Sequence, residues 1–127
     1  MVDLSPMTVM ALHRIAMETS NDTEQGIRDF GALESALARQ SFLRAYGKND
    51  PVELSVAVAV GLVQNHPFVD GNKRTAWQVL AWLLHAHGLQ FTPPSPTECA
   101  GMLRQLATHS VTESEFLSWV RRGCSCE

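Results

Sequence analysis

The part of this chain that organises the rest lies at residues 66–77 and reads HPFVDGNKRTAW, from His66 to Trp77. It sets six polar or ionisable side chains and one glycine between two strongly apolar segments, Val52 to Val63 and Ala76 to Ala86. The stretch is therefore predicted to be a loop that joins two elements of the core.

The two flanking segments are predicted to be helices. The valines of residues 56–60 alternate with alanines, which would suit a buried strand as well as a buried helix. The start of this segment favours a helix, because Asp50 can act as the N-cap and Pro51 suits the first helical position. The segment 76–86 has helical spacing and is followed by Gly88, a common helix stop.

The rest of the chain is predicted to be helical as well. Apolar residues recur at helical spacing in four further segments, at residues 7–19, 32–46 (with a break near Gln40-Ser41), 97–109 and 112–122. Residues 20–26 contain no apolar side chain and are predicted to be an exposed connection, whereas Leu89 to Thr92 is predicted to be extended chain or loop. We expect a single all-α domain over residues 1–127, a compact bundle whose core includes Trp77, Trp82 and Trp119.

Composition excludes several classes of function. The 13 acidic residues outnumber the 10 basic ones, so nothing indicates general affinity for nucleic acid or membranes. Three cysteines argue against a secreted disulfide framework, and Cys124 and Cys126 are predicted to lie in a frayed tail. No signal peptide and no run of 18 apolar residues is present, so we expect a cytoplasmic protein without a membrane span.

Residues 66–74 contain a candidate phosphate site. Gly71 to Arg74 falls at the start of the second core helix, where unpaired N–H groups and the helix dipole attract anions. The glycine permits close approach of a phosphate, the asparagine can donate to it, and Lys73 and Arg74 add positive charge. Asp70 is an oxygen ligand suited to Mg²⁺, and His66 can accept a proton near neutral pH.

These residues carry a resemblance to a known family. The signature of the Fic superfamily is matched by His66, Phe68, Asp70, Gly71, Asn72 and Arg74. Lys73 followed by Arg74-Thr75-Ala76 resembles the Doc (death-on-curing) branch, as do residues 26–29 (GIRD) and 33–39 (LESALAR).

The resemblance implies an all-helical Fic/Doc fold and the activity of a toxin in a type II toxin–antitoxin system. Such a toxin transfers the γ-phosphate of ATP to a threonine of elongation factor Tu and arrests translation. His66 would then be the base and Asp70 the Mg²⁺ ligand, while Asn72, Lys73, Arg74 and the Gly71 backbone would clamp phosphates. Phe68 would anchor the loop in the core.

Two other activities stay open. The same family includes enzymes that transfer AMP to a protein hydroxyl, and a catalytically inactive Fic domain could act as a binding module. Lys73 replaces a glycine and Trp77 an arginine of the AMP-transferring pattern, and both departures favour phosphate transfer.

The resemblance also implies an inhibitory partner. The nearest match to the inhibitory motif of some Fic proteins, Ser20 to Glu24, is followed by Gln25 and is scored as absent. We therefore expect inhibition by a Phd-type antitoxin that folds on binding, with DNA contacted only through that antitoxin.

The remaining polar residues are assigned structural roles. Single histidines on helices are expected to be surface or satisfied core residues, and isolated cations are expected on solvated helix faces. The first group is His13, His85, His87 and His109; the second, which could instead line the edge of the site, is Arg28, Arg39, Arg44 and Lys48.

Overall fold

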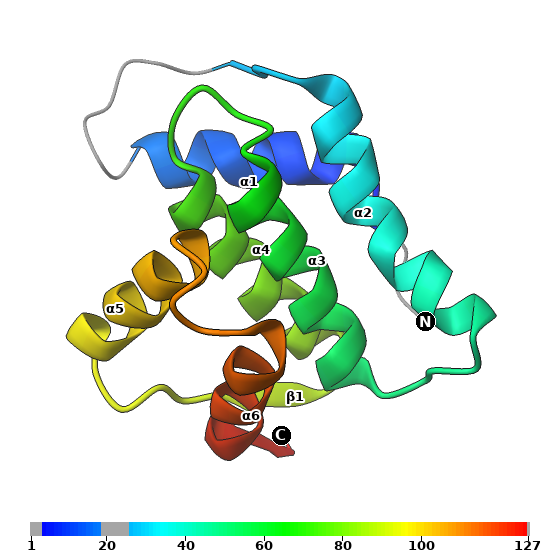
Figure 1. The fold of residues 1–127 in the computed structure, drawn as a ribbon, viewed down its shortest axis with the longest axis vertical. Coiled ribbons are helices and arrows are strands. Elements are labelled where there is room, and N and C mark those ends of the chain that lie inside the picture. Colours follow the sequence, from blue (N-terminus) through cyan, green and yellow to red (C-terminus); the bar gives the residue numbers. More distant parts are fainter. Residues whose placement is uncertain (1–3, 19–25, 127) are drawn as a thin grey trace.

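One buried helix, α3 (Pro51–Asn65), runs through the centre of the molecule (Figure 1). The structure, a computed structural model, describes residues 4–18 and 26–126. Every residue of α3 from Leu54 to Val63 is buried. The Asp50 carboxylate accepts a hydrogen bond from the Val52 backbone N–H (3.0 Å), which confirms the predicted start of this helix. Because α3 is buried on all sides, its apolar residues are not confined to one helical face, and its valine pattern does not distinguish a helix from a strand.

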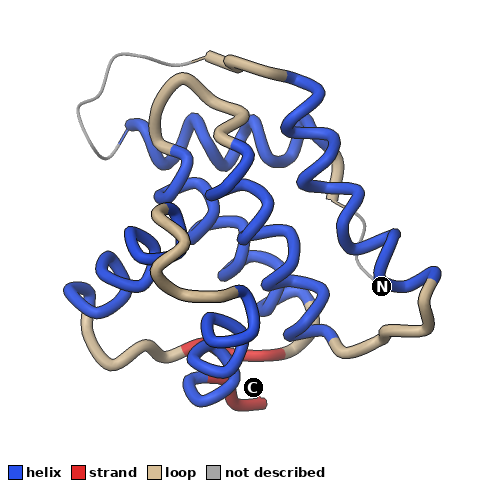
Figure 2. Tube along the Cα trace, in the orientation of Figure 1, coloured by secondary structure: helices blue, strands red, loops and turns tan. Residues whose placement is uncertain are grey.

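The other helices surround α3. Four pack directly against it: α2 (Phe30–Ala45), α4 (Asn72–Ala86), α5 (Pro96–Ala107) and α6 (Glu113–Gly123). The remaining described helix, α1 (Pro6–Glu18), packs mainly on α4 and crosses the end of the bundle that carries the motif loop (Figure 1). The described residues thus form six helices and one two-stranded sheet at an edge (Figure 2), and the all-α prediction is confirmed.

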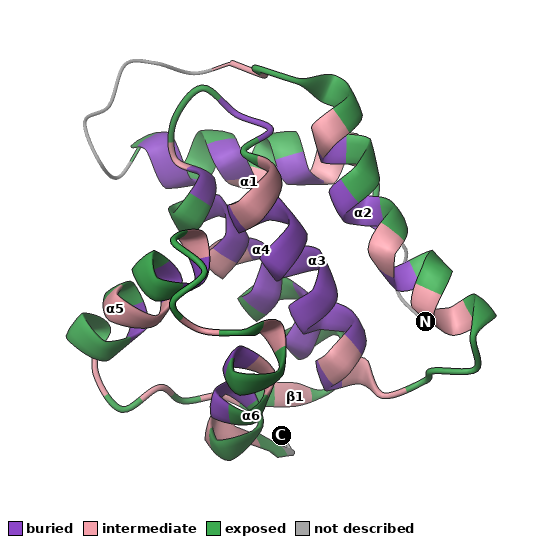
Figure 3. Cartoon of the chain, in the orientation of Figure 1, coloured by how far each residue is buried: buried purple, intermediate pink, exposed green. Residues whose placement is uncertain are grey.

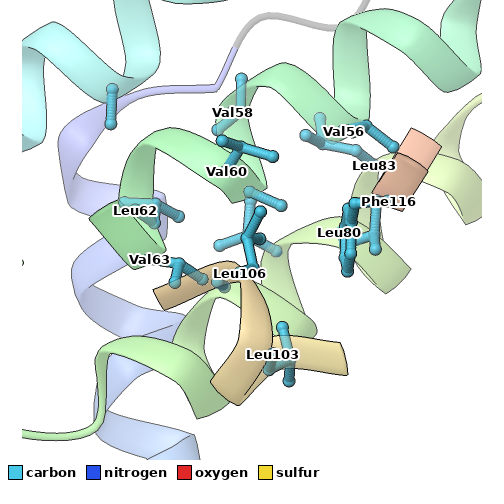
Figure 4. Close-up of a cluster of buried hydrophobic side chains, with 14 of the residues drawn as sticks. Val56, Val58, Val60, Leu62, Val63, Leu80, Leu83, Leu103, Leu106 and Phe116 are labelled. Atoms are coloured by element: carbon cyan, nitrogen blue, oxygen red, sulfur yellow. The ribbon is translucent and has the colours of Figure 1, made fainter. Parts of the chain in front are cut away.

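Apolar side chains of four helices meet in the core. Figure 4 shows valines and leucines of α3 packed against Leu80 and Leu83 of α4, Leu103 and Leu106 of α5, and Phe116 of α6. Each fully buried side chain of this size contributes about 1.5–3 kcal/mol relative to its exposed state. The core therefore holds rigid the two helices that the motif loop joins, and Figure 3 shows that exposed residues lie on the outer faces.

The C-terminal tail is ordered as a strand. β1 (Leu89–Phe91) pairs antiparallel with β2 (Cys124–Cys126), with Phe91 opposite Cys124. A Cβ on Gly123 would lie 2.7 Å from the Phe91 ring, so glycine permits this close approach. The predicted extended segment at residue 89 is confirmed, but the predicted frayed tail is wrong because its backbone pairs with β1.

Three local predictions are also corrected. α2 begins at Phe30, capped by Asp29, and continues unbroken through Gln40-Ser41, since neither residue removes a backbone donor. Trp82, predicted to lie in the core, is 37% exposed because it faces outward from α4. His109, predicted to lie on a helix, follows the end of α5 in a left-handed conformation (φ 61°).

Two predictions fall mainly outside the described residues. The exposed connection at residues 20–26 and the comparison of Ser20 to Glu24 with the inhibitory motif rest on residues 19–25, which the structure does not describe. None of the described helices combines the length and apolar character that a membrane crossing requires.

Candidate active site

The motif loop reverses the chain between the two core helices. α3 ends at Asn65 and is followed by its C-cap residue His66, whose backbone is left-handed (φ 50°). The chain enters α4 through Gly71, which is also left-handed (φ 78°). The loop lies at one end of the bundle, beside α1 (Figure 1). As a result, the His66 ring and the first turn of α4 line the same cleft, which has a volume of about 190 Å³.

The segment before α2 braces this loop through its backbone. The Arg28 and Asp29 N–H groups donate to the Pro67 carbonyl at 2.7 and 3.0 Å, and the Val69 N–H donates to the Gly26 carbonyl at 3.1 Å. These bonds form a bridge between Ile27 and Phe68. Residues 26–29, singled out in the sequence, thus hold the motif loop in place.

Arg28 also caps the C-terminus of α3. Its Nε donates to the His66 carbonyl at 2.7 Å, and its Nη2 donates to the Asn65 carbonyl at 2.9 Å. Such a cation satisfies carbonyls that a helix end leaves unpaired and complements the helix dipole. Arg28 therefore positions the backbone of the proposed base, and its predicted place on a solvated helix face is wrong.

Phe68 anchors the loop, as predicted. Its side chain is only 2% exposed, and its ring stacks on the His13 ring of α1 with centroids 3.9 Å apart and an interplanar angle of 6°. His13 is itself buried (4% exposed), and its Nε2 lies 2.9 Å from the Asp70 carbonyl oxygen. Because a carbonyl only accepts, Nε2 must carry the proton, and α1 fixes both the anchor and the backbone of Asp70.

Asn72 fastens the loop to the start of α4. Its Oδ1 accepts from the Phe68 N–H at 3.0 Å, and its Nδ2 donates to the Phe68 carbonyl at 3.0 Å. The same Nδ2 lies 3.4 Å from Nδ1 of His66. With 7% exposure, this side chain satisfies buried backbone groups, so its main visible role is to hold the loop; its predicted side-chain contact with phosphate stays a prediction.

Gly71 is required by two features of its surroundings. Its φ of 78° favours glycine, and an added Cβ would lie 2.5 Å from the sulfur of Met17 on α1. Its N–H donates to Oδ1 of Asp70 at 2.8 Å, an interaction that orients the carboxylate. The close approach of α1 thus fixes both Gly71 and Asp70 at the mouth of the cleft.

The N-terminus of α4 lies at the cleft. Gly71 is the N-cap residue of α4 and makes no side-chain cap hydrogen bond. Lys73 and Arg74 are exposed on this turn and line the cleft. Backbone donors, the positive end of the dipole and two cations meet at one point, an arrangement that binds anions such as phosphate.

A histidine and a carboxylate face the same anion site. His66 and Asp70 are exposed and line the cleft together with the first turn of α4. A lone carboxylate suits Mg²⁺, which is commonly held by one or two carboxylates together with substrate phosphates. The described residues contain no cluster of three or more metal-ligating side chains, so Asp70 fits a shared phosphate–Mg²⁺ site rather than an all-protein one.

The predicted site residues therefore gather in one place: the cleft is lined by His66, Val69, Asp70, Gly71, Asn72, Lys73 and Arg74. Besides Arg28, sequence reasoning missed two side chains of α1 that position this loop, Met17 beside Gly71 and His13 beneath Phe68. Their spacing of four residues on α1 gives a shared helix face, but a single sequence does not show what that face contacts. The expectation that His13 is a satisfied core residue is confirmed.

The fold and the cleft together define a helical protein in which a loop between two core helices brings a histidine and a carboxylate to the cationic start of a helix. A family model described as the Fic/DOC family matches residues 3–84. The chain belongs to this family.

A relative named as a toxin has a similar sequence. The chain is 35% identical over 89 residues to a protein named Toxin Doc from Mycolicibacterium smegmatis, a match that covers 67% of this chain and 68% of that protein.

Proposed function

We propose that this protein is the toxin of a type II toxin–antitoxin system and transfers the γ-phosphate of ATP to a hydroxyl of a protein. The observation that carries the proposal is the meeting of His66, Asp70 and the cationic first turn of α4 at one cleft. The name of the relative, Toxin Doc, supports the toxin role. The proposed substrate is a threonine of elongation factor Tu, by analogy with the Doc branch.

In the proposed reaction, the target hydroxyl lies between His66 and the terminal phosphate. His66 accepts the hydroxyl proton as the oxygen attacks the γ-phosphorus, and the bond from that phosphorus to the bridging oxygen breaks. ADP leaves with the bridging oxygen, and His66 returns its proton to solvent. Lys73, Arg74 and the backbone N–H groups at the start of α4 stabilise the charge that develops during transfer.

Asp70 is the proposed ligand of Mg²⁺. When bound, the cation would neutralise phosphate charge and orient the oxygens of the triphosphate. The bond from the Gly71 N–H holds one carboxylate oxygen at 2.8 Å and so limits how the side chain turns.

Phosphate transfer is favoured over AMP transfer by the residues on α4. Lys73 places a side chain at the anion site where the AMP-transferring pattern has glycine, and Trp77 supplies no charge where that pattern has arginine. Trp77 is instead packed against the rings of Phe91 and Trp119.

An antitoxin of the Phd type is the proposed inhibitor. A toxin whose cleft is open needs an external protein to restrain it, and a disordered segment that folds on binding can cover a large surface. Co-expression with a Phd-type antitoxin that binds this protein should restore growth of cells that the toxin alone arrests.

Radiolabelled ATP tests the proposal. Label in the γ-position should enter elongation factor Tu, and label in the α-position should not. With His66→Asn in place of the wild type, the γ-label should no longer enter elongation factor Tu. Asparagine tolerates the left-handed backbone of His66 better than alanine does, so this variant separates chemistry from folding. Transfer of α-label would instead establish AMP transfer, and no transfer to any protein of a cell extract would indicate an inactive binding module.

A further inference from the structure

The second half of α2 carries an exposed aromatic pair beside a hollow. Phe42 is 63% exposed and Tyr46 is 72% exposed, and their rings lie in tilted contact with centroids 5.0 Å apart. The hollow has a volume of about 400 Å³ and is lined by Ser35, Ala38, Arg39, Phe42 and Leu43. This half of α2 lies at an edge of the molecule, at the opposite end of the helix from the motif loop (Figure 1). Exposed aromatic rings next to a hollow are typical of a surface that binds another protein.

One wall of the hollow is held in a fixed position. The Arg39 side chain crosses from α2 to α3, where its Nη1 donates to the Ala57 carbonyl at 2.6 Å. Its Nη2 lies 2.7 Å from Oε1 of Glu113 at the start of α6. Because three helices fix this side chain, little ordering of the hollow is needed when a partner enters it.

The small and the large residues of this face are placed symmetrically about Phe42. Ala38 lies four residues before Phe42 and Tyr46 four residues after it, each about 6 Å away along the helix. Residues spaced by four lie on the same face of a helix. The hollow at Ala38 and the projecting ring of Tyr46 are therefore at equal distances on opposite sides of Phe42.

We infer that this face binds a second copy of the chain. A two-fold axis through Phe42 sets the two α2 helices antiparallel, so that Tyr46 of each copy enters the hollow at Ala38 of the other. The two Phe42 rings meet at the axis. Such an isologous contact uses one self-complementary patch on both copies, and small alanines let the helices approach closely.

The charges along α2 fit the same antiparallel arrangement. Glu34 is exposed near the start of the helix, and Lys48 is exposed just after its end. Lys48 contacts Glu53 at 3.3 Å, and its side chain stays half exposed. An antiparallel pair brings the acidic end of each α2 to the basic end of the other, and the helix dipoles oppose as well.

The size and position of the contact set its strength and its effect on the site. One helix pair buries an area at the low end of protein interfaces, below about 1,200 Å², so we expect a dissociation constant of about 1–100 μM. α2 begins beside the motif loop, about 18 Å along the helix from Phe42. The two motif loops therefore lie at opposite ends of the dimer, and both clefts stay accessible.

Sedimentation velocity over a range of concentrations tests the inference. Tyr46→Ala removes the projecting ring, and Ala38→Trp fills the hollow; both positions are exposed, so the fold should be kept. Each variant alone should raise the dissociation constant of the dimer about tenfold or more. Met7→Ala removes an 80% exposed side chain of α1 that lies off this face, and as the matched control it should associate like the wild type.

Mixing the two variants tests the antiparallel register. In a dimer of one Tyr46→Ala chain and one Ala38→Trp chain, the first contact is that of the wild type. In the second contact the introduced tryptophan faces the introduced alanine, so a large side chain again meets a small one. The equimolar mixture should therefore associate more tightly than either variant alone, with a dissociation constant within about threefold of the wild type.

Several results would overturn the inference. A wild-type protein that is monomeric at about 1 mM, or variants that associate like the wild type, would exclude this interface. Equal weakening by Met7→Ala would place the contact elsewhere, and a mixture no tighter than its components would refute the register. A monomeric wild type whose Tyr46→Ala variant binds an antitoxin or elongation factor Tu less tightly would assign this face to that protein instead. If Ala38→Trp lowers the melting temperature, Ala38→Leu replaces it and should give a smaller effect in the same direction.

Discussion

Replacing Asn72 should mainly destabilise the motif loop, because the Asn72 side chain fastens that loop to the start of α4. Its side chain exchanges two hydrogen bonds of 3.0 Å with the Phe68 backbone, and the pair is buried. Asn72→Ala removes both partners and leaves a buried N–H and a buried carbonyl unpaired, each at a cost of about 1–3 kcal/mol. Since the loop can relax and admit water, we expect a loss of about 2–4 kcal/mol in the free energy of unfolding.

Asn72→Asp gives a second, pH-dependent result. The Phe68 N–H keeps its acceptor, but a carboxylate oxygen replaces the donor that faces the Phe68 carbonyl. Two oxygens that face each other repel, so the variant should be destabilised at neutral pH. At acidic pH the new carboxyl group is protonated and can donate to that carbonyl, so the deficit relative to the wild type should shrink as the pH falls.

Urea denaturation followed by tryptophan fluorescence measures these effects. A lower midpoint with an unchanged slope reports a loss of stability. Asn49→Ala, at an exposed loop position, is the matched control and should change stability by less than about 0.5 kcal/mol. An Asn72→Ala variant that melts like the wild type but binds MgATP weakly would refute the role in the loop and make Asn72 a phosphate ligand alone.

The remaining predictions concern the anchor, the cap and the reacting groups. Phe68→Ala should cost about 3–5 kcal/mol because the site is fully buried, and a normal melting temperature would exclude the anchor role. Arg28→Lys keeps the charge but loses the paired donors to α3, so it should lower kcat for phosphate transfer and reduce stability by about 1 kcal/mol; wild-type kcat would contradict its positioning role. His66→Asn and Asp70→Asn should abolish growth arrest while their melting temperatures stay within a few degrees of the wild type, and growth arrest by either variant would remove that residue from the mechanism. Because Asp70 is proposed to hold Mg²⁺, raising the Mg²⁺ concentration should partly restore phosphate transfer by purified Asp70→Asn, whereas no recovery at saturating Mg²⁺ would contradict a role in metal binding alone.

Much of the fold could be read from the sequence because its signals are local. The cap at Asp50 and the proline at the start of α3 each act within one helical turn, and both are present. The apolar period predicted a break at Gln40-Ser41, because two polar residues interrupt the apolar pattern there. The backbone hydrogen bonds of α2 nevertheless continue through both residues.

The positions that sequence reasoning missed depend on contacts between distant segments. The tail forms β2 because Gly123 allows Phe91 to approach, and neither residue indicates that partner on its own. His13 and Arg28 similarly meet the motif loop from elements far away in the chain. The proposed reacting groups could be predicted to lie together because they are adjacent in sequence, whereas the residues that hold them in place could not.

The central claim is that His66 directs the terminal phosphate of ATP to a protein hydroxyl. Intact-mass measurement of purified elongation factor Tu, incubated with this protein, Mg²⁺ and ATP, tests that claim most directly. The account predicts a gain of one phosphate that is lost with His66→Asn. A gain the size of AMP, or an unchanged mass for elongation factor Tu and for every protein of a cell extract, would contradict it.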